Sequence, residues 1–311
     1  MEQPLISIIM NCYNSDRFLK EAIDSVYAQR YANWEIIFWD NASTDRSATI
    51  AQSYDELMKY HLAPQTTPLG EARNLALRRA TGKYIAFLDC DDRYLPEKLE
   101  KQVKLMESTH YAMCYGSAIT IDEQGAEIRR TLVKNQSGEL FGELLTHYEI
   151  NMQSVMVRRD LLVETQLNFA THLKYSPDHN LFMRIAAYHP VGVISDYIVQ
   201  YRVLDDSLSK KTVDIAASEM QFTLDQISAN SPKLRQKFTN EFEQAYQKLH
   251  YYEAVAALYR QDKKRARSEL KSVIFTKIEY LLLYLLLFLP VSIRKILKLL
   301  GRYNTCELSG N

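Results

Sequence analysis

Polar side chains follow three short apolar, β-branched runs in the first third of the chain. They are Asn11 and Asn14 after residues 5–10, Asp40, Asn41 and Asp45 after residues 34–39, and Asp89, Asp91 and Asp92 after residues 83–88. Asp89 and Asp91 are two residues apart, so on an extended backbone their carboxylates point the same way. Two such oxygen donors suit Mg²⁺ or Mn²⁺, which takes its remaining ligands from water and substrate phosphates. The pattern therefore predicts a metal-assisted phosphate site.

Each of these aspartates is also of a residue type that caps helices and closes turns. Taken singly, a capping or turn role is the more frequent explanation, and Asp92 precedes a helix that Pro96 is expected to open. Taken together, carboxylates after successive strands favour a shared ligand, because parallel strands bring their carboxyl ends to one edge of a sheet.

The elements that must position these residues alternate between strand and helix. Apolar runs predict strands at residues 5–10, 34–39, 58–62 and 83–88. Helical spacing of apolar residues predicts a helix from Asp16 and another over 69–80, the second closed by Gly82. This alternation predicts an α/β fold, a mostly parallel sheet flanked by helices.

The pattern changes in the second half. Residues 112–117 and 118–122 are predicted as two strands, with a turn at 123–125, and the half is expected to extend the same sheet. Residues 213 to about 276 are rich in helix formers, contain no glycine and show no catalytic signal. They are predicted to form a helical extension.

The chain is neutral as a whole, with 38 basic and 38 acidic side chains in 311 residues, which gives no bias toward nucleic acid. Residues 260–302 nevertheless contain eleven basic and three acidic side chains, so they carry +8, while residues 1–259 carry −7 and Glu307 carries the remaining −1. The uncharged stretch 280–293 is too short to span a bilayer and contains Pro290. Together with the neighbouring cations it predicts that 277–302 inserts into one leaflet of an anionic membrane surface. The alternative is a helix packed on the protein body or in an oligomer interface; the oligomeric state stays open.

Cysteine usage and the amino terminus indicate the compartment. Cys12, Cys90, Cys114 and Cys306 show no paired spacing, which favours reduced thiols. The first residues lack the basic region of a signal peptide. We therefore expect a cytoplasmic protein attached peripherally to the inner face of the cell membrane.

Five tracts, in order and spacing, resemble glycosyltransferase family 2, the inverting enzymes of GT-A (Rossmann-like) fold that transfer a sugar from a nucleotide diphosphate. They are SIIMNCYN (7–14), EIIFWDNASTD (35–45), GEARNLALRRATGKYIAFLDCDD (70–92), SPDHNLFMRIA (176–186) and YRVLDDSLS (201–209). The resemblance implies a catalytic domain over 1–212, divided into a nucleotide-binding half, 1–111, and an acceptor half, 112–212. The helical extension 213–276 and the basic, apolar tail 277–311 would follow it.

The resemblance also implies residue roles. It assigns nucleotide-sugar binding to Cys12, Tyr13, Asn14, Asp40, Asn41, Arg73, Asp89 and Cys90. Asp40 matches the residue that hydrogen-bonds uracil. Asp89 and Asp91 match the D-x-D metal motif, with Asp91 the expected direct ligand of Mn²⁺ or Mg²⁺. A cation suits this chemistry because the departing nucleoside diphosphate accumulates negative charge.

Asp178 matches the family's catalytic base, the carboxylate that deprotonates the acceptor hydroxyl. Its context also fits a capping carboxylate in a first helical turn, after Ser176 as N-cap and Pro177. Two positions depart from the family pattern. Pro177 stands where a polar residue is common, and Leu204 stands where a metal-binding histidine is frequent.

These observations predict a transferase that moves a sugar from a nucleotide-diphosphate donor, expected to be a UDP-sugar, to a hydroxyl of a glycan or lipid-linked glycan acceptor. The product would be a lipopolysaccharide or capsule precursor. Pro177 and Leu204 motivate a second hypothesis, a non-catalytic membrane scaffold. A third, a sugar-phosphate nucleotidyltransferase, lacks support because NCYNSDR (11–17) contains none of the glycines that a phosphate-cradling loop needs.

Overall fold

The computed structural model describes residues 3–204 and 213–300. The chain divides into two compact units, Met1–Leu204 and Asp205–Asn311, which are described separately. Residues 205–209 of the YRVLDDSLS tract lie outside the described residues, as do Arg302 and Cys306.

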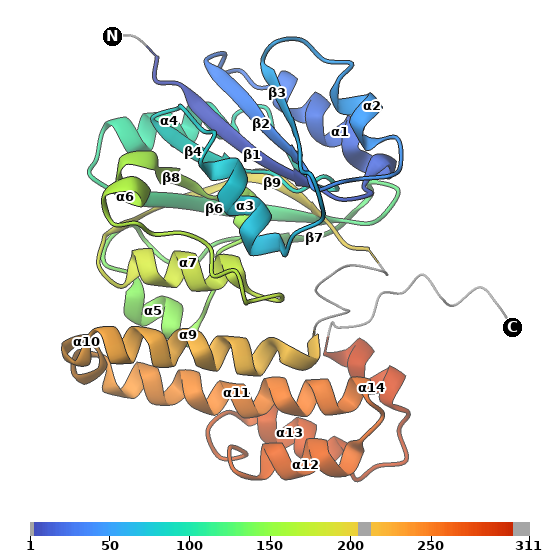
Figure 1. Ribbon diagram of the computed structural model, residues 1–311. Coiled ribbons are helices and arrows are strands. Elements are labelled where there is room, and N and C mark those ends of the chain that lie inside the picture. Colours follow the sequence, from blue (N-terminus) through green and yellow to red (C-terminus); the bar gives the residue numbers. More distant parts are fainter. Residues whose placement is uncertain (1–2, 205–212, 301–311) are drawn as a thin grey trace, which may run out of the picture. The chain divides into compact units, whose positions relative to one another are not determined.

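The first unit is built on one nine-stranded sheet (Figure 1). Its strand order is β3 (Met58–Leu62), β2 (Trp34–Asp40), β1 (Ile6–Cys12), β4 (Tyr84–Phe87), β8 (Met156–Arg158), β6 (Met113–Ile121), β9 (Val191–Arg202) and β5 (Arg93–Tyr94), with β7 (Glu127–Thr131) paired to β6. The strands β3, β2, β1 and β4 run parallel, whereas β8 is antiparallel to both of its neighbours. The predicted α/β fold with flanking helices is confirmed, with a sheet that is parallel through these four strands and mixed beyond them.

Helices cover both faces of the sheet, which explains why its first strands are apolar throughout. The helices of this unit are α1 (Asp16–Tyr27), α2 (Ser47–Ala51), α3 (Leu69–Leu77), α4 (Lys98–Glu107), α5 (Phe141–Thr146), α6 (Arg159–Glu164) and α7 (Pro177–Ala186), with a 3₁₀ turn η1 (Met152–Ser154). Ile8 of β1 shares a core cluster with Leu19 and Ile23 of α1. Helix α3 contacts β1 and β2 and lies in front of the sheet in Figure 1.

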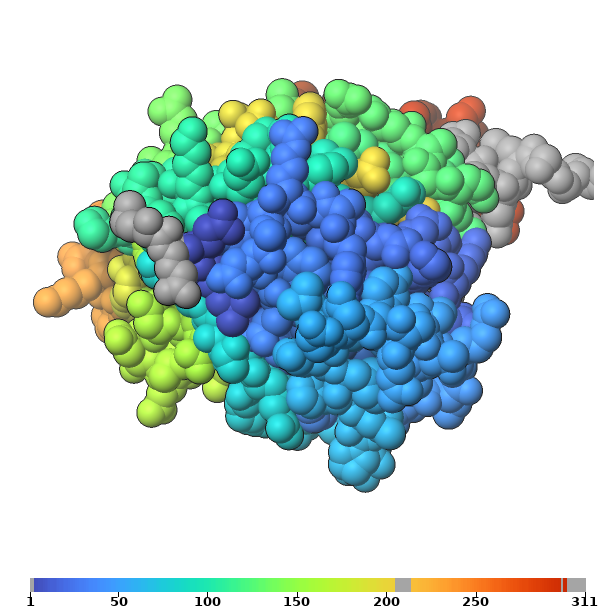
Figure 2. Space-filling model, turned by 90° about the horizontal axis from the view of Figure 1, so that it is seen from above, coloured from blue at the N-terminus to red at the C-terminus, as the bar shows by residue number. Residues whose placement is uncertain are grey.

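An ion pair joins the two halves of this unit at the surface. Arg17 of α1 pairs with Glu123, in the turn between β6 and β7, at 2.6 Å. Figure 2 shows that the blue amino-terminal part of this unit and its green part adjoin on this face of the surface. The single sheet runs through both parts, so residues 3–204 form one continuous body.

Two local predictions were wrong. The two strands expected at 112–117 and 118–122 are a single strand, β6, whose register on β9 shifts on either side of Ser117. A bulge lets one long strand continue where the sequence pattern suggested a break. Gly82 does not cap α3, which ends at Leu77 with Arg78 as its C-cap. Gly82 instead allows a close approach, because a Cβ there would lie 2.6 Å from the Ser7 nitrogen.

The second unit is helical, as predicted for 213–276. It contains η2 (Val213–Ile215), α9 (Ala216–Asn230), α10 (Pro232–Lys237), α11 (Thr239–Tyr259), α12 (Lys263–Lys271), α13 (Ile278–Leu286) and α14 (Ile293–Leu299). No helix in the described part of the chain is long and apolar enough to cross a membrane.

One side of the apolar stretch 280–293 is packed against other helices of the second unit. Tyr280, Leu283 and Leu287 are buried in a cluster with Leu258 and Leu270 of the same unit. One face of α13 is therefore packed against protein, which is the alternative that the sequence left open. The other face is exposed.

Candidate active site

The carboxyl ends of β1, β2 and β4 lie side by side, as the parallel register requires. The Asn41 N–H donates to the Cys12 carbonyl at 2.8 Å, and the Cys90 thiol donates to the Asn11 carbonyl at 3.3 Å. The loops after these three strands therefore share one edge of the sheet, as the strand pattern predicted.

Asp40 is buried at the end of β2, with both carboxylate oxygens engaged. One accepts a hydrogen bond from the Ser43 N–H at 2.8 Å, and the other from the Tyr60 hydroxyl at 2.7 Å. Burial, and after it the Asp40 contact, raises the pKa of Tyr60, so this phenol stays a donor. Each carboxylate oxygen keeps a second lone pair, but Asp40 has no accessible surface, so a ligand N–H reaches it only after a neighbouring side chain moves.

Asn41 has a different environment from Asp40. Its amide nitrogen donates to the Thr67 carbonyl at 2.8 Å, and its oxygen accepts from the Thr67 N–H at 3.0 Å. These bonds hold the segment before α3 against the end of β2. The predicted ligand contact of Asn41 would use atoms that already secure this loop.

The loop after β1 carries the other predicted base-binding residues. Tyr13 is exposed, with 53 % of its surface accessible, so its ring can stack on a ligand. Asn14 adopts a left-handed backbone (φ 49°), and its side-chain oxygen accepts from the Thr44 N–H at 2.8 Å. Cys12 is buried beside Cys90, whose hydrogen bond lowers the pKa of the Cys12 thiol. The loop is thus tied to the segment after β2.

Asp89 is held from two sides. The buried Arg73 guanidinium lies 3.2 Å from one carboxylate oxygen, and the Gln153 amide nitrogen donates to the other at 2.7 Å. The Asp89 N–H also donates to the Gln153 side-chain oxygen at 2.8 Å. Gln153 belongs to η1, 64 residues from Asp89, and sequence reasoning missed it because no local pattern marks it.

Asp92 does not converge with the other carboxylates on the sheet edge, as the sequence had suggested. Its side chain is buried inside the protein. A carboxylate oxygen accepts from the Arg202 N–H at 2.7 Å. Burial, with Asp91 and Asp89 nearby, raises the pKa of Asp92 well above its usual value. Arg202 also donates to the Asp91 carbonyl at 2.9 Å and pairs with Glu21 at 2.8 Å. These two residues fix the backbone of the D-x-D loop.

Asp178 lies half-buried in the first turn of α7. Burial raises its pKa, and the charge of Arg73 opposes that shift. Since Arg73 also contacts Asp89, one guanidinium acts on both carboxylates. Asp178 and the D-x-D loop therefore belong to one electrostatic constellation, although residues 89 and 178 are far apart in the sequence.

The side chains at this edge of the sheet could bind a divalent cation only if a bound ligand supplied some of the coordinating oxygens. Within residues 3–204 and 213–300, no three His, Cys, Asp or Glu side chains are placed to hold a metal ion by themselves. Asp89 is engaged by Arg73 and Gln153, and Leu204 offers no donor atom. Asp91, one of two closely spaced carboxylates, fits Mg²⁺ or Mn²⁺ that takes further oxygens from a diphosphate.

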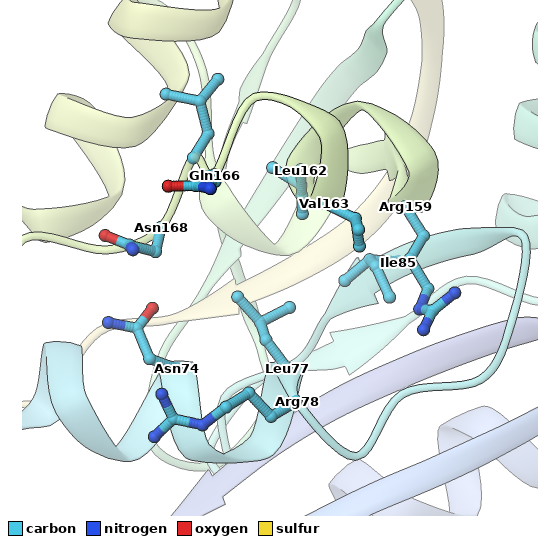
Figure 3. A pocket seen from close by; sticks show the side chains of 10 residues that line it. Asn74, Leu77, Arg78, Ile85, Arg159, Leu162, Val163, Gln166 and Asn168 are labelled. Carbon is cyan, nitrogen blue, oxygen red and sulfur yellow. The ribbon is translucent and has the colours of Figure 1, made fainter.

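A cavity of about 430 Å³ lies away from these residues, between α3 and α6 (Figure 3). Asn74, Leu77 and Arg78 line one side, and Arg159 and Leu162 another. None of the predicted site residues lines it. Asn74 also bonds the Phe169 backbone at 2.8 and 2.9 Å, so this face of α3 supports the segment that leads to α7.

The sequence matches known glycosyltransferases. Residues 7–164 match the model of glycosyl transferase family 2. An uncharacterized glycosyltransferase of Haemophilus influenzae is 36 % identical over 163 residues, 51 % of this chain and 64 % of that protein. One from Rickettsia felis is 32 % identical over 64 % of this chain and 33 % of its own. The chain thus spans less than two thirds of these relatives' length.

The Escherichia coli protein WfgD, named as a UDP-Glc:alpha-D-GlcNAc-diphosphoundecaprenol beta-1,3-glucosyltransferase, is 30 % identical. The match covers 67 % of this chain and 81 % of that protein.

Solved structures share the fold. S. aureus TarS in complex with UDP-GlcNAc aligns with a TM-score of 0.60 at 17 % identity, over 85 % of this chain and 87 % of that one. The mannosyltransferase PcManGT of Pyrobaculum calidifontis, in complex with GDP-Man and Mn²⁺, aligns with a TM-score of 0.62 at 18 % identity, over 89 % and 77 %. The chain belongs to glycosyl transferase family 2 and has the GT-A fold.

Proposed function

We propose that this protein transfers a sugar from a nucleotide-diphosphate donor, a UDP-sugar, to a hydroxyl of a cell-surface glycan precursor, with inversion. The observation that carries this proposal is Arg73, which contacts Asp89 and acts electrostatically on Asp178. A phosphate-side carboxylate and a carboxylate suited to accept a proton are thereby coupled in one site. The names of two relatives support the substrate class: WfgD, and TuaG of Bacillus subtilis, a putative teichuronic acid biosynthesis glycosyltransferase.

The loops after β1 and β2 would bind the base. Once a neighbouring side chain moves aside, Asp40 would accept the uracil imide N–H through its second lone pair, and Tyr13 would stack on the ring. Cys12, Asn14 and Asn41 shape this pocket through the bonds that tie its loops together. Tyr60 keeps Asp40 oriented during binding.

The D-x-D loop would bind the diphosphate. Asp91, and Asp89 on the other side of Cys90, would hold Mn²⁺ or Mg²⁺, with further oxygens supplied by the diphosphate. The cation, when bound, neutralises charge that develops on the departing diphosphate. Arg202 and Asp92 keep the loop backbone in place, and Arg73 supplies fixed positive charge beside Asp89.

Asp178 would accept the proton of the acceptor hydroxyl. A raised pKa makes its carboxylate a better proton acceptor than an ordinary aspartate at neutral pH. One base and one in-line displacement invert the configuration at the anomeric carbon. Pro177 at the first position of α7 pre-sets the backbone that presents Asp178.

The test is UDP release by the full chain from UDP-glucose and UDP-N-acetylglucosamine, with GDP-mannose as the specificity control, each with Mn²⁺ and with chelator. We expect slow donor hydrolysis that depends on the cation and prefers a UDP-sugar. No release from any donor would favour the scaffold hypothesis. Pyrophosphate release from UTP and a sugar phosphate would favour the nucleotidyltransferase.

We further propose that the outer face of α13 attaches the protein peripherally to the inner face of the cell membrane. Ile278, Leu282, Leu285 and Leu289 recur at helical spacing and are each more than half exposed. The spacing of Ile278, Leu282 and Leu285 puts them on one side of α13, opposite buried Leu283, and Leu289 follows just beyond the end of the helix. Cations that include Lys277, Arg294 and Lys295 flank this stripe and suit anionic headgroups. A lipid-linked acceptor stays at the same surface.

A further inference from the structure

One segment of the acceptor half, residues 147–153, contacts both ends of the proposed site. Gln153 at its end holds Asp89 through two hydrogen bonds. Tyr148 near its start packs against the His179 ring, with ring centroids 4.5 Å apart. His179 directly follows Asp178 in α7, and the Asp178 charge also acts on the Tyr148 phenol, so Tyr148 lies near the proposed base.

The segment is anchored between these two contacts. Glu149 accepts hydrogen bonds from the Tyr115 hydroxyl at 2.8 Å, the Lys134 N–H at 2.8 Å and the Asn135 N–H at 3.1 Å. Asn151 accepts from the Gln153 N–H at 3.0 Å. The backbone that carries Tyr148 is therefore held in place before any substrate binds.

The Tyr148 hydroxyl is the unusual group in this anchored segment. Its oxygen is shielded from solvent and has no hydrogen-bond partner within the described residues. A shielded hydroxyl without a partner destabilises the fold, and a bound ligand that pairs with it would remove that cost. Burial, and after it the Asp178 charge, raises the pKa of Tyr148 well above its usual value, which keeps the phenol protonated.

We propose that the Tyr148 hydroxyl hydrogen-bonds the acceptor sugar and orients the hydroxyl that Asp178 deprotonates, an inference that rests on the proposed function. The acceptor oxygen forms a bond to the anomeric carbon as its proton moves to Asp178. The bond from that carbon to the diphosphate oxygen breaks, and its electron pair leaves with the nucleoside diphosphate. Tyr148 keeps its proton throughout, so its contribution is orientation of a polyhydroxylated acceptor.

The experiment compares Tyr148→Phe with Tyr115→Phe in the full chain. Each change removes one hydroxyl, but Tyr115 already has protein partners, Glu149 and Asn135. UDP release from UDP-glucose and Mn²⁺ is measured in water alone and with a synthetic N-acetylglucosamine diphosphate that carries a short alkyl chain. For Tyr148→Phe we expect transfer to fall about 10-fold or more, with hydrolysis and the KM for donor within about twofold. Tyr115→Phe loosens the segment that carries both Tyr148 and Gln153, so for this variant we expect transfer and hydrolysis to fall together.

Two results would overturn the inference. Transfer by Tyr148→Phe at the wild-type rate would show that the hydroxyl does not contact the acceptor. An equal loss of transfer and hydrolysis would assign Tyr148 a structural role. Both are distinct from failure of the proposed function, in which the wild-type protein itself neither hydrolyses the donor nor transfers its sugar, and the inference falls with it.

Discussion

Asp178 lies half-buried in the first turn of α7, and its raised pKa links activity to stability. Asp178→Asn keeps the shape but cannot accept a proton, so we expect transfer to fall by about 10²–10⁴-fold. UDP release with acceptor and Mn²⁺ measures this. Asp160→Asn, on the exposed start of α6, is the control and should transfer normally. Full transfer by Asp178→Asn would remove Asp178 from the site.

The same shift fixes the sign of the pH dependence. Because the folded protein raises the pKa of Asp178 above the ordinary value of about 3.9, its ionised form destabilises the fold at neutral pH. Asp178→Asn should therefore melt at the same or a higher temperature at pH 7.5, and the difference should vanish as pH falls below both pKa values. Wild-type transfer should be lost at a higher pH than an ordinary aspartate predicts. A thermal melt and a pH–rate profile check both.

Gln153 positions Asp89 through both ends of its amide. Gln153→Ala should weaken UDP binding in Mn²⁺ by about 10-fold, because the carboxylate loses a hydrogen bond and its orientation. Gln153→Glu places a second negative charge there and should weaken binding further. Calorimetric titration with UDP measures the change, and Gln166→Ala on the exposed segment before Phe169 is a matched control. Unchanged affinity in both Gln153 variants would contradict this role.

The sequence alone allowed prediction of polar residues that come directly after a strand in the chain. Asp40 and Asp89 were predictable because strand ends can be read from local apolar runs. Gln153 and Tyr60 were not, because each meets its aspartate through tertiary packing, across 64 and 20 residues. Tyr148 carries no local signal either, since its significance lies in a missing partner that only the folded structure reveals.

At the scale of elements, the strands and helices of the first half were predictable to within a few residues. Strand β3 was predicted at its observed bounds, 58–62. The errors arose where tertiary context overrode local pattern. A bulge keeps β6 continuous through Ser117, and Gly82 serves the approach of a loop to β1 instead of ending α3.

Gly82 gives the test of that correction. A Cβ at this position would lie 2.6 Å from the Ser7 nitrogen and 2.7 Å from the Leu5 carbonyl oxygen, both of them backbone atoms. Gly82→Ala should therefore destabilise the first unit by about 1–3 kcal/mol. Urea unfolding measures the change in free energy. The backbone of Gly82 has no positive φ, so alanine can adopt its conformation without strain. A loss of this size would therefore come from the close approach to β1, and an unchanged free energy of unfolding would contradict it.

At the scale of the whole molecule, the neutral net charge conceals a −7 portion and a +8 portion. This division was visible in the sequence, whereas the packing of α13 was not. Apolar content alone cannot distinguish a face buried in the protein from a face available to lipid. The alternation of buried Leu283 with exposed Leu282 and Leu285 makes that distinction.

The α13 surface predicts vesicle binding. The double change Leu282→Glu and Leu285→Glu adds charge on the exposed face and should abolish sedimentation with phosphatidylglycerol-containing vesicles. Val163→Glu, an exposed apolar residue of the first unit, should leave sedimentation unchanged. UDP binding should be normal in all variants. Equal sedimentation of the double variant and the wild type would contradict attachment through this face.

Arg202 ends the last strand of the first unit, yet it supports loops made from much earlier sequence. It bonds the Asp91 carbonyl and pairs with Glu21, 181 residues upstream. The order of synthesis therefore matters. A growing chain that already contains Asp40, Asp89 and Asp91 still lacks the side chain that holds the Asp91 backbone, as does any fragment that ends at residue 164. We therefore expect the proposed donor site to form only after β9 joins the sheet, so that UDP binding would report completion of the whole first unit.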